Sequence, residues 1–210
     1  MKKPMTREVK IPPIPLARVE VVIQGITPLR CNRFREDAIK GIEDKQQKVA
    51  KIAKAARDPK AEFEGSIHKL PNGKFGFPAI GIKLAMVTAA GRFADEKMTE
   101  MLGSISIEAD LIEIEGPKPR MSKDMVVLSS GMKKICSVAY RPCWDDWKMT
   151  VPISYLSNKL SVEQVLNILQ YAGTSVGIGS WRVEKKGTGG QFRVIKARAM
   201  DETAAVAAVA

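Results

Sequence analysis

The sequence contains few of the residues on which metal binding and covalent catalysis usually depend. It has one histidine, His68, and three cysteines, Cys31, Cys136 and Cys143, with no CxxC spacing among them. A structural zinc site takes four such ligands, commonly in closely spaced pairs. We therefore expect no bound metal and no cofactor. The odd cysteine count favours a reducing, cytosolic setting over a disulfide-bonded secreted one.

Long apolar runs and catalytic motifs are lacking too. No apolar stretch approaches the roughly 18 residues that span a bilayer, and the first residues lack the apolar core of a signal peptide. No nucleophile elbow or local triad pattern is present. The adjacent acids Asp145 and Asp146 point apart on a strand or turn, which favours a loop acid pair over a metal site. An enzyme is not predicted.

Acidic residues are outnumbered. The 210 residues include 34 Lys and Arg against 23 Asp and Glu, a net charge of +11. The excess is concentrated in residues 1–60, with 15 basic and 7 acidic residues, and in residues 177–200, with 6 and 1. Such a balance is typical of proteins that bind polyanions. The two basic regions form one surface if the fold brings them together.

The second basic region contains a glycine-rich loop, residues 177–193, with five glycines, a tryptophan and four basic side chains. Glycine lets the backbone approach a ligand closely. Arg and Lys donate hydrogen bonds to phosphate, and Trp offers a face on which a base stacks. The loop therefore indicates nucleic-acid binding. The alternative is that the glycines only build a flexible hairpin and that Trp181 packs at its rim.

Known nucleotide-binding loops do not fit this segment. The loop follows a predicted helix instead of a strand, Arg182 stands where a dinucleotide-binding motif has its third glycine, and the GK[ST] ending of a P-loop is missing. A nucleotide cofactor is therefore not expected.

Trp144 and Trp147 are expected in the core or at its rim.

Hydrophobic periodicity predicts alternating strands and helices. The expected strands and strand-like segments are 17–24, 66–70, 74–77, 104–114, 125–128, 135–140, 148–155 and 191–197. The expected helices are 36–57, ended by Asp58-Pro59; 79–92, begun by Pro78; and 161–172, stopped by Gly173. Ser161 and Gln164 form a capping-box pattern. Pro152 suggests an edge strand or a bulge.

This order predicts an α+β fold with a ferredoxin-like, RRM-like antiparallel sheet and helices on one face. We expect an extended basic arm over 1–16 and a single α+β domain over 17–200. Insertions are expected around 30–78 and 114–147, and a flexible tail over 201–210. Such a fold hosts many functions and proves none.

Three segments carry a family resemblance. The C-terminal helix followed by a basic glycine-rich loop and a last strand resembles the RAMP superfamily of RRM-like proteins, which includes the RNA-binding backbone subunits of CRISPR effector complexes. Gly25-Ile-Thr-Pro28-Leu resembles the opening strand and turn of those subunits, and Phe77-Pro78-Ala79-Ile80-Gly81-Ile82-Lys83-Leu84-Ala85 their helix start, with Ile80 where Ser is usual. The segment from Tyr140 to Arg193 also resembles a family of small bacteriophage proteins, which brings no function with it.

Together these observations favour a cytoplasmic protein of a bacterial cell or phage-infected host that binds single-stranded RNA or DNA, with RNA ahead. The RAMP resemblance implies several copies along one strand, as a homo-oligomer or filament. A phage structural or assembly protein and a single-strand annealing protein are the alternatives. The expected contact residues are Arg30, Arg33, Arg35, Lys83, Gly177, Gly179, Trp181, Arg182, Lys185, Lys186 and Arg193.

Overall fold

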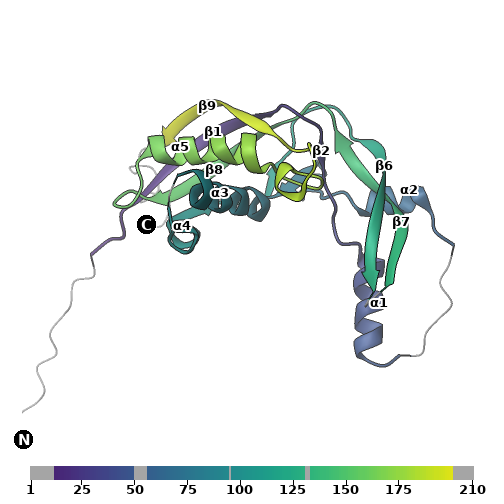
Figure 1. Cartoon of the computed structure of the whole chain (residues 1–210). Helices are drawn as coiled ribbons and strands as arrows, with labels where there is room; N and C mark the ends of the chain where they lie inside the picture. The colour runs from purple at the N-terminus through teal and green to yellow at the C-terminus, as the bar shows by residue number, and fades with distance from the viewer. Residues whose placement is uncertain (1–11, 50–55, 95, 131–132, 201–210) are drawn as a thin grey trace, which may run out of the picture.

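The computed structural model describes residues 12–49, 56–94, 96–130 and 133–200 (Figure 1). The tail at 201–210 and most of the expected basic arm lie outside these residues. The strands are β1 (Leu16–Gly25), β2 (Leu29–Arg30), β3 (Gly76–Pro78), β4 (Ile105–Ile107), β5 (Leu111–Glu113), β6 (Arg120–Ser130), β7 (Lys133–Trp144), β8 (Lys148–Leu156) and β9 (Phe192–Met200). The helices are α1 (Glu36–Gln46), α2 (Pro59–Gly65), α3 (Ala79–Phe93), α4 (Met98–Ser104) and α5 (Val162–Tyr171), with a π-helical turn η1 (Ala172–Val176) and a 3₁₀ turn η2 (Val183–Lys185).

The main sheet has the strand order β4-β8-β1-β9, and every neighbouring pair is antiparallel. In chain order its elements run β1, α3, β4, β8, α5, β9, which is the ferredoxin-like arrangement. Figure 1 shows α3 and α5 side by side on one face of this sheet. The predicted fold class is therefore confirmed.

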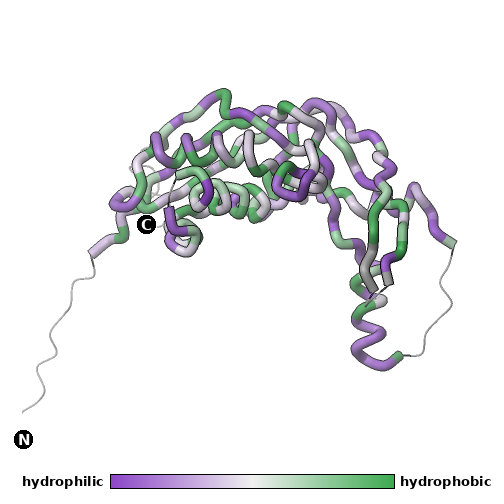
Figure 2. Tube along the Cα trace, viewed as in Figure 1, coloured by the Kyte–Doolittle hydropathy of each residue, from purple (hydrophilic) through white to green (hydrophobic). Residues whose placement is uncertain are grey.

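The core lies between this sheet and its two long helices. Alternate residues of β1 point toward the helices, and the register places Val19 opposite Ile153 and Val21 opposite Val151. All four are buried, as the period of two in a half-buried strand requires. Apolar side chains of α3 and α5 close the core from below: Ile82, Met86, Val165, Ile168 and Leu169. Figure 2 shows α3 mostly in the colours of apolar residues, whereas hydrophilic and apolar residues alternate along α5.

A second group of elements projects from the sheet. We call β2, β6, β7, α1 and α2 the hairpin lobe, because the long β6–β7 hairpin dominates it (Figure 1). Its three strands form a sheet in the order β2-β7-β6. Within the lobe, Arg57 ties α2 to β7: it donates to both carboxylate oxygens of Glu62 on α2 (2.6 Å each) and to the carbonyl of Val138 on β7 (2.6 Å). β2 continues directly from the turn after β1, so the lobe and the main sheet share this connection.

The expected helix over 36–57 is wrong in its extent. Helix α1 ends at Gln46, Lys48 has a positive φ of 59°, and residues 50–55 lie outside the described part of the chain. No residue of α1 is buried, so its apolar stripe has no packing partner that would stabilise a longer helix. Asp58-Pro59 begins a helix instead of ending one. Asp58 caps α2 through the amides of Lys60 and Ala61, with proline at the first helical position.

Three further boundaries differ from expectation. Residues 104–114 form two short strands in different sheets, β4 and β5. Ile105 is the buried residue of the first strand and Ile112 that of the second, so the buried positions change from odd to even numbers between them. Strands 125–128 and 135–140 extend into the full β6–β7 hairpin. Gly173 does not stop the last helix, which continues as η1 to Gly177, where φ is 73°.

Pro152 lies on an inner strand, not an edge. It does sit where β4 leaves β8: the last β4–β8 pair is Ile107–Ile153, and the carbonyl of Pro152 accepts from the amide of Glu108 at 3.0 Å. The capping box at Ser161 and Gln164 is confirmed, with both reciprocal hydrogen bonds present (2.8 and 3.3 Å). Trp144 and Trp147 are buried in the core, as expected.

Candidate nucleic-acid interface

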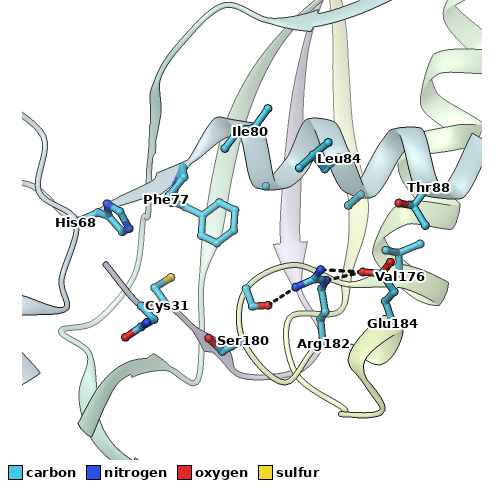
Figure 3. A pocket seen from close by; sticks show the side chains of 15 residues that line it. Cys31, His68, Phe77, Ile80, Leu84, Thr88, Val176, Ser180, Arg182 and Glu184 are labelled. Atoms are coloured by element: carbon cyan, nitrogen blue, oxygen red, sulfur yellow. Dashed lines mark hydrogen bonds and ion pairs between the residues drawn. The ribbon is translucent and has the colours of Figure 1, made fainter. Parts of the chain in front are cut away.

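A pocket of about 430 Å³ lies where three segments distant in sequence meet (Figure 3). One wall is the first half of α3, another is the chain just after β2, and the third is the glycine-rich loop. Its lining residues are Cys31, Asn32, His68, Phe77, Pro78, Ile80, Gly81, Leu84, Ala85, Thr88, Val176, Gly179, Ser180, Arg182 and Glu184. The structure thus places residues 31–32 of the N-terminal basic region, the Pro78 helix start and the glycine-rich loop around one opening.

Backbone hydrogen bonds hold the loop against the turn after β1. The amide of Ser180 donates to the carbonyl of Arg30 (2.8 Å), and the amide of Gly190 donates to that of Pro28 (2.9 Å). Within the loop, the amide of Ile178 donates to the carbonyl of Gly190 (3.0 Å). These bonds follow from the pairing of β1 with β9, which brings both strand ends to the same edge.

Two glycines are required by close approach inside the protein. Gly179 has a φ of 77°, and a Cβ there would collide with the carbonyl oxygen of Arg30. Gly190 has a φ of 67°, and its Cβ would collide with the carbonyl oxygen of Ile178. Residues other than glycine rarely adopt this left-handed backbone conformation. At these positions the backbone approaches its own chain, so the loop is a folded unit, not a loose hairpin.

Trp181 is the exposed aromatic residue of the loop. Its side chain is 48% exposed and its φ is 60°, a conformation that is uncommon for a bulky residue. The carbonyl of Trp181 accepts from the amide of Gly189 (2.9 Å), which helps to hold this conformation. An exposed ring on a backbone fixed in this way is available for stacking.

Arg182 reaches into the pocket but is already bonded within the loop. Its guanidinium pairs with Glu184 (2.8 Å) and donates to the carbonyl of Gly179 (3.2 Å), as the dashed lines in Figure 3 show. Arg92 lies 3.6 Å from the other carboxylate oxygen of Glu184. The pair therefore stabilises the loop and leaves the pocket close to neutral.

The three predicted N-terminal arginines are also ion-paired. Arg33 lies 2.7 Å from Glu36, and Arg35 lies 3.3 Å from Asp37. Arg30 points into the hairpin lobe, where it is 3.6 Å from the buried carboxylate of Asp124. Its carbonyl accepts from the amide of Ser180, a lining residue, but Arg30 itself does not line the pocket.

The remaining predicted cations are more available. Within the described part of the chain, no acidic group lies within ion-pair distance of Lys83, Lys185 or Lys186. Lys185 and Lys186 are exposed in and after η2, beside the pocket's Glu184. Arg193 is exposed on β9 and donates to the side chain of Gln24 (3.2 Å). Lys83 is half-buried and does not line the pocket, and neither does Gly177.

Sequence reasoning missed the apolar wall. Ile80 and Leu84 are 58% and 48% exposed, although both are large aliphatic side chains on α3. Ser is usual where this chain has Ile80 in the RAMP helix start that residues 77–85 resemble. This departure was the available clue in the sequence, because an exposed isoleucine has no role in the core. His68 is half-buried and lines the opposite end of the pocket.

Burial changes the ionisation of two lining groups. Desolvation, with a contribution from the nearby Arg33, lowers the pKa of His68 below its usual range. His68 is therefore neutral at pH 7 and offers both a donor and an acceptor nitrogen. Burial, together with the neighbouring Cys143, raises the pKa of Cys31, so its thiol stays protonated.

Among the described residues, no group of three or more His, Cys, Asp or Glu side chains is arranged to hold a metal ion. Over the same residues, none of the helices has the length and apolarity needed to cross a membrane.

Comparison with known proteins finds similarity to solved structures. No family model and no curated protein matches the sequence. One similar solved chain comes from the structure of the Type III-B Cmr-beta bound to cognate target RNA. The identity is 12% and the TM-score 0.47. The match covers 89% of this chain, which spans 61% of the length of the other.

Proposed function

We propose that this protein binds single-stranded nucleic acid, RNA in preference to DNA, along the surface formed by the glycine-rich loop, the first half of α3 and the turn after β1. The observation that carries the proposal is the meeting of these three segments around one pocket. The same loop has an exposed tryptophan and two lysines with no ion-pair partner among the described residues. Lysines neutralise phosphates, and aromatic faces stack bases. The RAMP-like segments at 25–29 and 77–85 favour RNA.

Titration of labelled single strands at two salt concentrations tests this proposal. We expect fluorescence anisotropy to show binding of RNA and DNA oligonucleotides at low salt, with weaker binding of DNA. The affinity should fall steeply with added salt, since phosphate contacts release counterions. Sequence should matter little. Absence of binding at low salt would leave the phage assembly role as the better interpretation.

We further propose that several copies assemble along one strand. The support is an apolar face on the β6–β7 hairpin that the described residues leave exposed. Met125 lies opposite Val138 in the register, and Val127 follows two residues later on the same face. Their exposed fractions are 73%, 40% and 59%. Exposed apolar surface of this kind is typical of a protein–protein contact.

A further inference from the structure

The walls of the pocket are mainly apolar, although the surface around it is basic. Ile80 and Leu84 form its exposed edge on α3, and Val176 and Phe77 lie deeper (Figure 3). Its volume of about 430 Å³ falls within the range of pockets that enclose small organic ligands. A phosphate is small, strongly hydrated and gains nothing from aliphatic walls. The shape therefore suits a flat, largely apolar group.

The charges lining the pocket also argue against a phosphate site. Arg182 is the only cation among the lining residues, and Glu184 neutralises it at 2.8 Å. A carboxylate in the pocket repels an anion, so a phosphate there would have to displace this ion pair. Lys185 and Lys186, which have no ion-pair partner in the part of the chain that the structure describes, lie on the loop outside the lining.

Polar groups at the two ends of the pocket can form hydrogen bonds with the edges of a flat ligand. His68 lies at one end and Thr88 and Glu184 lie at the other, with Ser180 between them (Figure 3). Asn32 also lines the pocket. They supply donors and acceptors on both sides of an apolar centre. Unstacked nucleobases in protein–RNA complexes are held in this way, by contact with their faces and hydrogen bonds to their edges.

We infer that the pocket takes one unstacked base of the bound strand, while the lysines of the loop contact the adjoining phosphates. This inference rests on the proposed single-strand binding and adds to it a base contact. Ile80 and Leu84 would pack against the face of the base, and the polar end groups would meet its edges. Binding then depends on the presence of bases, and not only on the charge of the strand.

Two matched single strands, one with bases and one without, test this inference. One is a single-stranded oligonucleotide of about 12 nucleotides, within the range of single-strand site sizes; the other has the same length and phosphates but only abasic sugars. The intact protein should bind the abasic strand at least about fivefold more weakly, as expected for one lost base contact. Ile80→Ala should weaken binding of the base-bearing strand by a similar factor and leave binding of the abasic strand unchanged.

Ile195→Ala is the matched control, because Ile195 is 44% exposed on β9 and does not line the pocket. It should change neither affinity, and thermal unfolding of both variants should match the parent. Equal weakening of both strands by Ile80→Ala, or equal binding of both strands by the parent, would overturn the base pocket while single-strand binding stands. Failure of the parent to bind either strand at low salt would overturn the proposed function itself.

Discussion

The basic side chains of the glycine-rich loop differ in whether they already form ion pairs within the protein. Arg182 is bonded to Glu184 and to a backbone carbonyl, so replacing it removes a support of the loop as well as a cation. Lys185 has no such partner among the described residues and is exposed. A double substitution of both would mix the two effects. Lysine variants alone separate binding from folding.

We predict that Lys185→Ala weakens single-strand binding without loss of stability. Removal of one phosphate contact should reduce the slope of log Kd against log salt by about 0.7. Surface substitutions of this kind change stability by about 0.5 kcal/mol or less. Lys159→Ala is the control, since Lys159 is equally exposed but lies at the opposite end of α5. Identical salt slopes for the two variants would place Lys185 outside the contact surface.

Composition alone was enough to single out the glycine-rich loop. It could not show the ion-pair partners of the predicted contact residues. Arg30 and Asp124 are 94 positions apart, and their approach depends on the pairing of β2 with β7. A local pattern cannot show such a pair. The predicted contact residues therefore remain predictions. The structure shows which of them are exposed and which are ion-paired.

At the scale of elements, predictions held where the local pattern and the tertiary packing agree. Strand β1 and helix α5 have clear periodicity, and each buries the face that its sequence indicates. Helix α1 has a comparable pattern but buries nothing, and its end could not be predicted from periodicity. Asp58-Pro59 was ambiguous, because the same pair can follow one helix or cap the next.

The glycine-rich loop should depend strongly on Gly190. We predict that Gly190→Ala lowers the free energy of unfolding by at least about 1–2 kcal/mol, since the new side chain must adopt a left-handed conformation. It also collides with the carbonyl of Ile178. Gly103→Ala in α4 is the control: its Cβ meets nothing within 4 Å, so this variant should be as stable as the parent or slightly more so. Chemical denaturation measures both. Equal stabilities would show that the loop relaxes at little cost.

On the scale of the whole molecule, the hairpin lobe projects from the main sheet (Figure 1). The pocket is lined by α3, the chain after β2 and the glycine-rich loop, whereas Met125, Val127 and Val138 lie on the β6–β7 hairpin. The proposed strand binding and the proposed contact between copies can therefore be tested independently.

We predict that Met125→Ser with Val127→Ser reduces the number of copies on a long single strand and leaves the affinity for a short one unchanged. Serine removes the apolar area that a neighbouring copy would cover. Sedimentation of the protein with strands of increasing length measures the number bound. Ile195→Ser with Met200→Ser, an exposed apolar pair on β9 (44% and 48%), should leave that number unchanged. If both double variants load the long strand like the parent, this face is not the contact.

The pairing of β1 with β9 also determines how the molecule can be attached to a surface. Gly25 and Phe192 pair at the pocket end of the sheet, and Arg18 and Met200 pair at the other. At about 3.3 Å per residue, these ends are roughly 23 Å apart. A linker joined directly before β1 or directly after β9 thus leaves from the end of the sheet that is remote from the pocket. Protein tethered to a sensor chip through such a linker would present its pocket to the flowing solution.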